Sequence, residues 1–300
     1  MHPVFDDFVC YGRETFAARS DYRQMLLDTF STVMTSPRLG AEDRAYACQL
    51  GEAMMLNLTG ICDEAVPVLI ERAVAAMFGR DDDPNFPVTT SLFLHALNLV
   101  VAAIHYDAPL AFSVLDAKGW TVRFCQEWLK HLSKLVRVYD RKLTIAAICA
   151  ILGWVKAIQQ AAIAQYTPQL LAGALVAFKD LPAAINDRRN QQQSLETTDD
   201  NADALADADD LEDLLDAEDD DGDVLDGDAD FLERVLADKV RHCAHTRAIR
   251  LLTGSLQDSV ASETSLWSDE VLWQSPLDDI DVFALFATTM QSASSSHRYQ

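Results

Sequence analysis

The chain has 300 residues, is 49% apolar and carries a formal net charge of −23. This length and apolar content are enough to bury a substantial core, and no stretch reaches the roughly 18 uncharged apolar residues of a membrane-spanning helix. The N-terminal residues lack the basic region and apolar core of a signal peptide. Only 11 Gly and 9 Pro are present, which favours helices over a sandwich or barrel that would need frequent turns.

Hydrophobic spacing predicts a series of helices joined by short connections in the first 180 residues. Several are amphipathic, whereas Val88–His105 and Asp140–Gln159 are apolar nearly all round, which indicates interior helices. The expected helices are Asp21–Thr35, Ala41–Leu58, Asp63–Phe78, Val88–His105, Asp107–Ala117, Thr121–Val138, Asp140–Gln159 and Gln169–Phe178.

A helix that is buried on both sides needs neighbours on both sides, and stacked helix pairs supply them. The expected pairs span roughly 40–50 residues, which is the period of HEAT repeats. We therefore predict an all-α fold, an α-solenoid of HEAT or armadillo-like helical repeats. A compact helical bundle is the alternative.

An acidic tract, Asp199–Asp230, comes after these helices. Of its 32 residues, 17 are Asp or Glu and none is Lys, Arg or His, so the rest of the chain carries a net charge of −6. Like charges repel and the few Leu residues are too sparse for a core, so we expect a disordered insertion. The tract is either a solubilising linker or an electrostatic site for basic proteins, whose binding would depend strongly on salt. The candidate cargo-binding carboxylates are Asp207, Asp209, Asp210, Glu212, Asp213, Asp216, Glu218, Asp219, Asp220, Asp221 and Asp223.

We expect three domains: a HEAT-repeat solenoid at 1–194, an acidic disordered insertion at 195–230, and a C-terminal segment at 231–300 with a polar loop and a terminal docking helix. In the last domain, Phe231–Leu252 reads as a helix with a basic face, on which the acidic tract can fold back when no cargo is present. Ser275 is expected to cap a helix beginning at Pro276. Its apolar stripe, for docking against the last repeat, comprises Leu277, Ile280, Phe283, Ala284 and Phe286.

No catalytic or phosphate-binding motif is present in the sequence. His95 and Cys149 lie on interior helix faces and read as core residues. His242 and His245, with Cys243, lack the second ligand cluster of a metal site, and the acidic residues do not fit the EF-hand frame. We expect no enzyme, no cofactor and no metal. The cysteines never form a Cys-x-x-Cys pair and read as buried reduced thiols, at Cys10, Cys48, Cys62, Cys125, Cys149 and Cys243.

Several segments, taken in order, resemble the C-terminal part of the importin-beta superfamily of nuclear transport receptors, in particular the branch of importins seven and eight. The acidic insertion occupies the corresponding place in that order. The segments are Phe8-Val-Cys-Tyr-Gly12, Asp43-Arg-Ala-Tyr-Ala-Cys-Gln-Leu50, Ala65-Val-Pro-Val-Leu69, Tyr139-Asp-Arg-Lys142 with Ile148-Cys-Ala-Ile-Leu152, and Ser275-Pro-Leu-Asp-Asp-Ile-Asp-Val-Phe283.

This resemblance implies a HEAT-repeat receptor that shuttles between cytoplasm and nucleus through the pores of the nuclear envelope. Its partners would be basic cargo proteins such as ribosomal proteins or histones, Phe-Gly nucleoporins, and Ran-GTP. The Ran-binding N-terminal repeats of the family have no counterpart here, so we expect a fragment or a truncated paralogue. No membrane partner is expected, and the negative net charge disfavours direct binding to nucleic acid. A HEAT-type scaffold or adaptor without a transport role is the alternative.

Overall fold

The computed structural model describes residues 8–79, 88–154, 161–202 and 275–296. The chain divides into two compact units, residues 1–192 with 269–300, and residues 193–268. Nearly all of the second unit lies outside the described residues, so the described helices belong almost entirely to the first. Every described helix or strand element is helical, in the order α2 (Arg13–Ala18), α3 (Ser20–Thr35), α4 (Ala41–Asn57), α5 (Val66–Phe78), α6 (Thr90–Tyr106), α7 (Ala108–Ala117), α8 (Thr121–His131), a 3-10 turn (Leu132–Lys134), α9 (Val138–Gly153), α11 (Ala161–Ala164), α12 (Thr167–Ala202) and α15 (Val282–Ser296).

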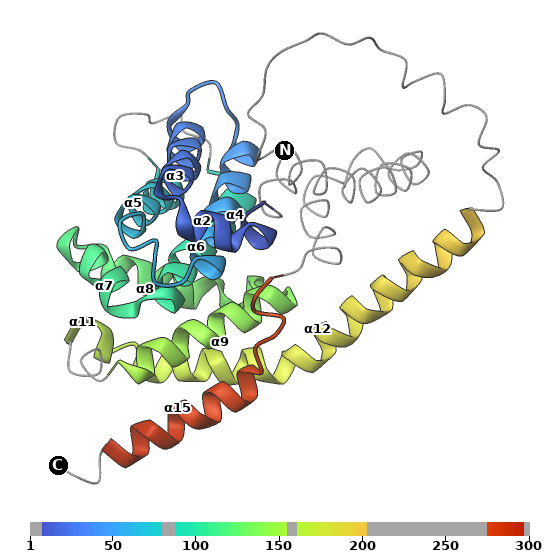
Figure 1. Cartoon of the computed structure of the whole chain (residues 1–300). Coiled ribbons are helices and arrows are strands. Elements are labelled where there is room, and N and C mark those ends of the chain that lie inside the picture. The colour runs from blue at the N-terminus through green and yellow to red at the C-terminus, as the bar shows by residue number, and fades with distance from the viewer. Residues whose placement is uncertain (1–7, 80–87, 155–160, 203–274, 297–300) are drawn as a thin grey trace. The chain divides into compact units, whose positions relative to one another are not determined.

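The helices of the first unit stack in two layers (Figure 1). In one layer α4 packs on α6, α6 on α9, and α9 on α15. In the other, α3 contacts α5, α5 contacts α7, and α7 contacts α8. α12 continues this second layer, because its Gly173 lies against Leu132, directly after α8. The successive groups are α3 with α4, α5 with α6, α7 and α8 with α9, and α12 with α15; each adds one helix to the first layer and one helix, or in the third group two, to the second. The predicted all-α helical-repeat fold is therefore confirmed.

The central helices of the first layer are apolar because they have neighbours on several sides. Every residue of α6 from Leu94 to Ile104 is buried, as the apolar pattern of Val88–His105 predicted. The helix begins after Thr89, whose hydroxyl accepts a hydrogen bond from the N–H of Leu92. α4 approaches α6 closely at Gly51, where a Cβ atom would come within 2.8 Å of Leu99. Larger side chains at this position would push the two helices apart.

Two predicted helices end several residues earlier than expected. The helix expected over Thr121–Val138 ends at His131, and Val138 instead begins α9. The reason is Arg137, whose backbone is extended and whose N–H donates to the Asp140 carboxylate at 3.3 Å, so a new helix start is formed there. The helix expected to run to Gln159 ends at Gly153, because Trp154 has an extended backbone.

α12 is much longer than the expected helix Gln169–Phe178. It continues through Pro182 and reaches Ala202, so it includes the first four residues of the acidic tract. Proline disfavours a helix interior, and the sequence therefore favours an early end. Packing overrides this preference, because Leu181 and Ile185 belong to a core cluster with Ile145 of α9 and Val282 of α15.

The prediction of core positions is confirmed for His95 and Cys149, which are 3% and 4% exposed. The five cysteines in the described ranges are all free thiols, and four of them are buried. Burial raises the pKa of the Cys125 thiol to about 12 and that of Cys62 to about 11. Within the described ranges, none of the helices combines the length and apolar character needed to cross a bilayer.

Candidate functional site

The eleven candidate carboxylates of the acidic tract, Asp207 to Asp223, lie outside the described residues, as do Phe231–Leu252 and the His242, Cys243 and His245 group. The structure does describe the segment where the chain returns to the helical stack, Ser275 to Asp281, together with α15. α12 and α15 form one helix pair, so the tract is inserted within the last pair rather than after it. The returning segment is therefore the described anchor nearest to the C-terminal end of the tract.

The returning segment is a turn rather than the first turn of a helix, so the predicted helix start at Pro276 is wrong. The N–H of Ser275 donates to Asp278 Oδ2 at 3.0 Å, and Ser275 Oγ accepts from the N–H of Leu277 at 3.2 Å. Asp281 is the residue that caps α15, because its Oδ1 accepts from the N–H groups of Phe283 and Ala284 at 3.0 and 3.1 Å. The Asp281 carboxylate also complements the positive end of the helix dipole.

Two basic side chains hold this turn against the stack. Lys142 Nζ, on α9, donates to the carbonyl oxygens of Leu277 and Asp278 at 2.8 and 3.0 Å. Arg188, on α12, pairs with the Asp278 carboxylate at 2.7 Å. Burial lowers the pKa of Lys142, partly offset by the nearby Asp278. We call Lys142, Arg188 and Asp278 the turn clamp.

The stripe expected on this segment is only partly buried. Leu277 is 1% exposed, and Ile280 and Phe286 pack against the core cluster around Leu181. Phe283 is instead 49% exposed and Ala284 also faces solvent, while Val282 takes a buried place that the sequence did not predict. The docking side of α15 is therefore rotated from the predicted stripe, because the helix begins at Val282 and not at Pro276.

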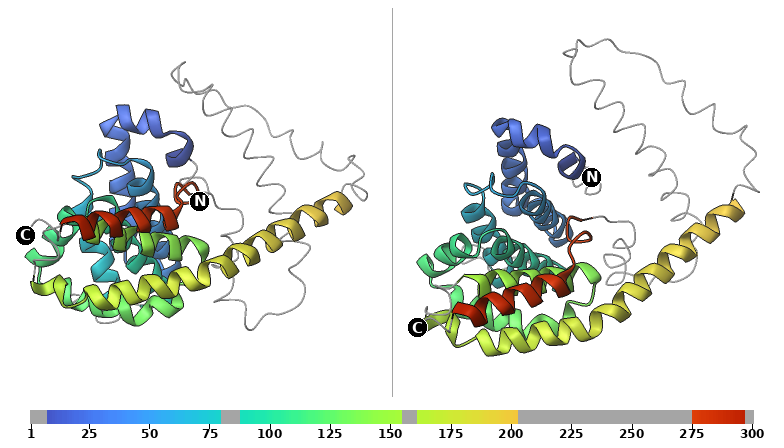
Figure 2. Two further views of the ribbon diagram at one scale, coloured as in Figure 1. Left: turned by 90° about the horizontal axis from the view of Figure 1, so that it is seen from below. Right: turned by 60° about the horizontal axis from the view of Figure 1, so that its bottom comes forward.

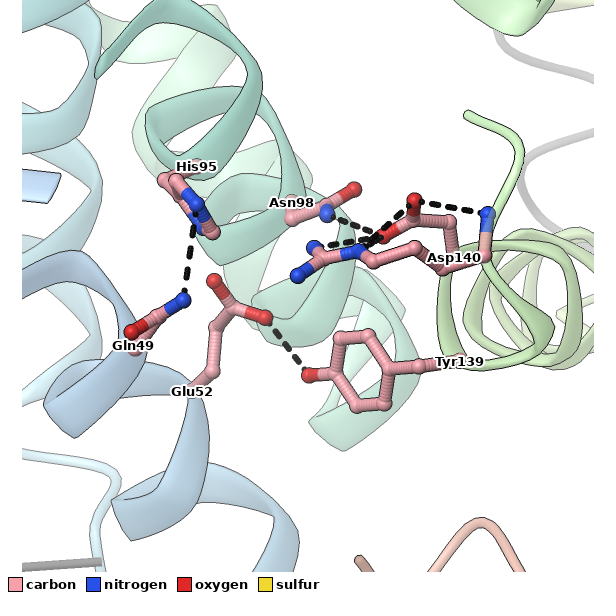
Figure 3. Close-up of polar contacts among 7 residues, drawn as sticks. Gln49, Glu52, His95, Asn98, Tyr139 and Asp140 are labelled. Carbon is pink, nitrogen blue, oxygen red and sulfur yellow. Dashed lines mark hydrogen bonds and ion pairs between the residues drawn. The ribbon is translucent and has the colours of Figure 1, made fainter. Parts of the chain in front are cut away.

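The clamp lysine belongs to a run of four residues, Tyr139-Asp-Arg-Lys142, which connects α9 to its neighbours. Arg141 donates to the carbonyl oxygen of Asp180 on α12 at 2.7 Å. Asp140 is fully buried, and its Oδ1 accepts from Asn98 of α6 and from Arg137, each at 2.8 Å (Figure 3). Lys142, Arg141 and Asp140 therefore bond to different parts of the stack: the turn before α15, α12 and α6.

Tyr139 extends the polar contacts to α4. Its hydroxyl donates to Glu52 Oε2 at 2.6 Å, and Gln49, one turn before Glu52, lies 3.4 Å from the His95 ring of α6 (Figure 3). Burial, and then the neighbouring Glu52 carboxylate, raise the pKa of Tyr139 well above its usual range. The hydroxyl therefore stays protonated and keeps donating.

The contacts of Figure 3 form a polar centre, which we define as Gln49, Glu52, His95, Asn98, Arg137, Tyr139 and Asp140. Its groups are buried and directed at one another across α4, α6 and α9. Buried polar contacts of this kind fix how helices are aligned, because a shift of one helix would leave charged groups unpaired in the interior. The polar centre therefore acts on the alignment of the stack and offers no exposed nucleophile or base.

Sequence reasoning does not find the turn clamp or the polar centre. Tyr139-Asp-Arg-Lys142 stands out in the sequence only through a family resemblance, and Gln49 and Glu52 only as part of a predicted helix. The detectable signal is three charged residues at the start of a helix that is otherwise apolar. Such residues need buried partners, but the sequence does not say which.

The fold defines a helical-repeat protein whose described part carries stacked helix pairs. Over 147 residues, which is 49% of this chain, the sequence is 19% identical to the "Probable importin-7 homolog" of Dictyostelium discoideum. The chain covers 14% of the length of that relative. No family model matches the chain, and no solved structure matches it.

Proposed function

We propose that this chain is the C-terminal part of a nuclear import receptor, which binds basic cargo proteins for transport through the nuclear pore in a Ran-dependent cycle. The observation that carries the proposal is the similarity to an importin-7 homolog over half of the chain, in a protein built of stacked helix pairs. The proposed partners are ribosomal proteins or histones as cargo, Phe-Gly nucleoporins and, through repeats outside this chain, Ran-GTP. The proposed location is the cytoplasm, the nucleus and the pore between them.

The proposed mechanism is physical and needs no chemical step. The carboxylates of the acidic tract attract a basic protein, and the electrostatic field raises the rate of encounter. Lys142 and Arg188 hold the chain at Leu277 and Asp278, which follow the tract only after residues 231–274.

The test is a binding measurement with a histone or a ribosomal protein across a series of salt concentrations. Three proteins are compared: the full chain, a chain lacking Asp199–Asp230, and a full-length chain whose acidic tract has Asn and Gln in place of Asp and Glu. We expect the affinity of the unaltered chain to fall steeply with salt, and both variants to bind weakly at low salt. Equal affinity for all three would remove the tract from cargo binding.

A helical-repeat scaffold or adaptor for basic proteins is the second candidate, because stacked helix pairs also serve proteins without a transport role. The two candidates differ in a cellular readout. A receptor predicts that a fluorescent basic reporter accumulates in nuclei of permeabilised cells when the complete protein and Ran-GTP are supplied. Binding of the reporter without accumulation would favour the scaffold.

A further inference from the structure

Ser275, the first residue of the returning segment, is partly exposed to solvent, and so is Pro276 after it. The Oγ of Ser275 accepts a hydrogen bond from the N–H of Leu277 at 3.2 Å, and its own N–H donates to Asp278. Both views of Figure 2 show this segment leading into α15, which lies beside α12. The hydroxyl therefore lies near the surface, in the turn that precedes the docked helix.

A serine or threonine directly before proline is the substrate pattern of the proline-directed class of protein kinases. Proline can be recognised there because its ring fixes φ and removes the N–H. The chain has three such positions, Ser36, Thr167 and Ser275. Thr167 begins α12 and its hydroxyl donates to the carbonyl oxygen of Ile163 at 3.4 Å, so the helix keeps it from the extended form that a kinase binds. Ser36 and Ser275 lie outside helices and remain as candidates.

The charged side chains that bond beside these two serines have opposite signs. Arg44 donates to the carbonyl oxygen of Ser36 at 2.9 Å, whereas the carboxylate of Asp278 accepts from the N–H of Ser275 at 3.0 Å. A phosphate on serine carries about −1.5 to −2 charges near neutral pH. At Ser36 this charge would meet a cation, and at Ser275 it would repel the neighbouring carboxylate.

The other charges beside the returning segment do not cancel this repulsion. The turn clamp contributes two cations, Lys142 and Arg188. Three carboxylates lie near Lys142, those of Asp278, Asp279 and Asp281, so the local balance is one excess negative charge before any modification. Arg188 already pairs with Asp278 at 2.7 Å, and Lys142 donates to two carbonyl oxygens. Neither cation can neutralise a phosphate without weakening its present contact.

We propose that Ser275 is a phosphorylation site and that its phosphate releases the turn clamp. A proline-directed kinase transfers the γ-phosphoryl group of ATP: the Oγ–P bond forms, the bond to the β-phosphate breaks, ADP leaves, and the hydroxyl proton passes to the catalytic base of the kinase. The added charge repels Asp278, so the pair with Arg188 is broken and the turn separates from the stack. This inference concerns the docking of α15 and does not rest on the proposed function.

The turn clamp also controls how fast Ser275 is modified. Leu277 is 1% exposed, so a kinase can bind the residues after Ser275 in extended form only when the turn opens. The rate of modification then follows the fraction of molecules with an open turn. Loss of the clamp raises this fraction, and a phosphate on Ser275 prevents the turn from closing again.

The first experiment treats the full chain with ATP and a purified kinase of the cyclin-dependent class and locates the phosphate by mass spectrometry. We expect phosphate on Ser275. The initial rate should be about tenfold higher in Arg188→Ala, because the open fraction rises when the clamp cation is lost. Arg189→Ala is the matched control, since Arg189 is adjacent and exposed, and its rate should equal that of the unaltered chain. Circular dichroism confirms that each variant is folded.

The second experiment measures hydrogen exchange of the phosphorylated chain by mass spectrometry. Amides of residues 277–286 should exchange about tenfold faster than in the untreated chain, while those of α6 stay unchanged. Ser275→Ala, carried through the same kinase treatment, should exchange alike before and after it.

Two results would overturn the proposal. The site is wrong if Ser275 carries no phosphate in the unaltered chain and in Arg188→Ala, or if Ser36 alone is modified. The release is wrong if Ser275 carries phosphate and exchange in residues 277–286 is unchanged or slower, because Arg188 and Lys142 would then bind the phosphate and keep the turn closed.

Discussion

Asp140 is the residue on which the polar centre depends most. Its carboxylate is fully buried and pairs with Arg137 at 2.8 Å, while Asn98 of α6 donates to the same oxygen. A buried ion pair contributes little over an apolar pair of similar shape, but removing one partner is costly because a charge stays in the interior. The alignment of α6 and α9 therefore relies on a single negative charge.

We expect Asp140→Asn to lower the free energy of unfolding by about 3–5 kcal/mol, because the buried Arg137 charge loses its carboxylate. Urea denaturation followed by circular dichroism measures this change. Asp21→Asn is the matched control, since Asp21 also pairs with an arginine, Arg19, but at the surface, where screening leaves little net stabilisation. A similar loss in both variants would contradict the role assigned to the polar centre.

α15 and the turn before it are held by residues that lie far away in the sequence. Its partners, Lys142 and Arg188, lie 136 and 90 residues before Asp278, so its docking must offset the closure of a long loop. The apolar contacts of Val282 and Phe286 contribute the main burial, and the turn clamp fixes where the helix begins. Loss of the clamp should therefore release the turn before the rest of the stack.

Arg188→Ala is expected to raise the hydrogen exchange rate of amides in residues 277–286 by about tenfold, because a charge-assisted hydrogen bond to Asp278 is lost. Exchange followed by mass spectrometry measures the rate. Arg189→Ala is the control, since Arg189 is exposed and adjacent in sequence. Unchanged exchange in Arg188→Ala, or the same increase in both variants, would show that the clamp does not hold the turn.

α12 contains a proline in its interior, which lowers the stability of this helix. Pro182 has no N–H to donate within the helix, and proline is about 3 kcal/mol less favourable than alanine in a helix interior. Because Pro182 is exposed, Pro182→Ala should raise the free energy of unfolding by about 1–3 kcal/mol, measured by urea denaturation. A decrease instead would mean that the proline shapes α12 for the packing of Leu181.

At the scale of the whole molecule, the stack buries several groups that must stay protonated. Burial raises the pKa of Cys62 to about 11 and of Cys125 to about 12, and it also raises the pKa values of Tyr106 and Tyr139. Unfolding restores their ordinary pKa values, so above about pH 8.5 the unfolded chain binds fewer protons than the folded chain. Stability then falls as pH rises.

We therefore expect the urea midpoint to be steady near pH 8 and to fall progressively from about pH 9 towards pH 11. Tyr139→Phe should make this slope shallower at its upper end, because one protonated group is removed from the folded interior. Exposed Tyr11→Phe is the control. A midpoint that is constant to pH 11 would contradict the burial of these groups.

Of the two candidate functional features, the sequence predicts the charge of the acidic tract but not the turn clamp. The charge of the tract is a property of composition and is read directly from the residues. The turn clamp cannot be read from the sequence in this way, because Lys142 and Asp278 are distant in sequence and each alone resembles an ordinary surface charge. The expected cap at Ser275 failed for a related reason: Ser275 and Asp281 are both good caps, and the packing of Val282 decides between them.

The sequence by itself determined that the described part of the chain is helical, which two helices are interior, and that His95 and Cys149 lie inside. These features follow from the spacing of apolar residues along one helix, which is a local property. Only the tertiary structure decided that α15 completes a pair with α12, that α12 runs past Pro182, and that Tyr139-Asp-Arg-Lys142 connects α9 to α4, α6, α12 and the turn before α15. These depend on contacts between residues far apart in the chain, where burial and charge pairing outweigh local preference.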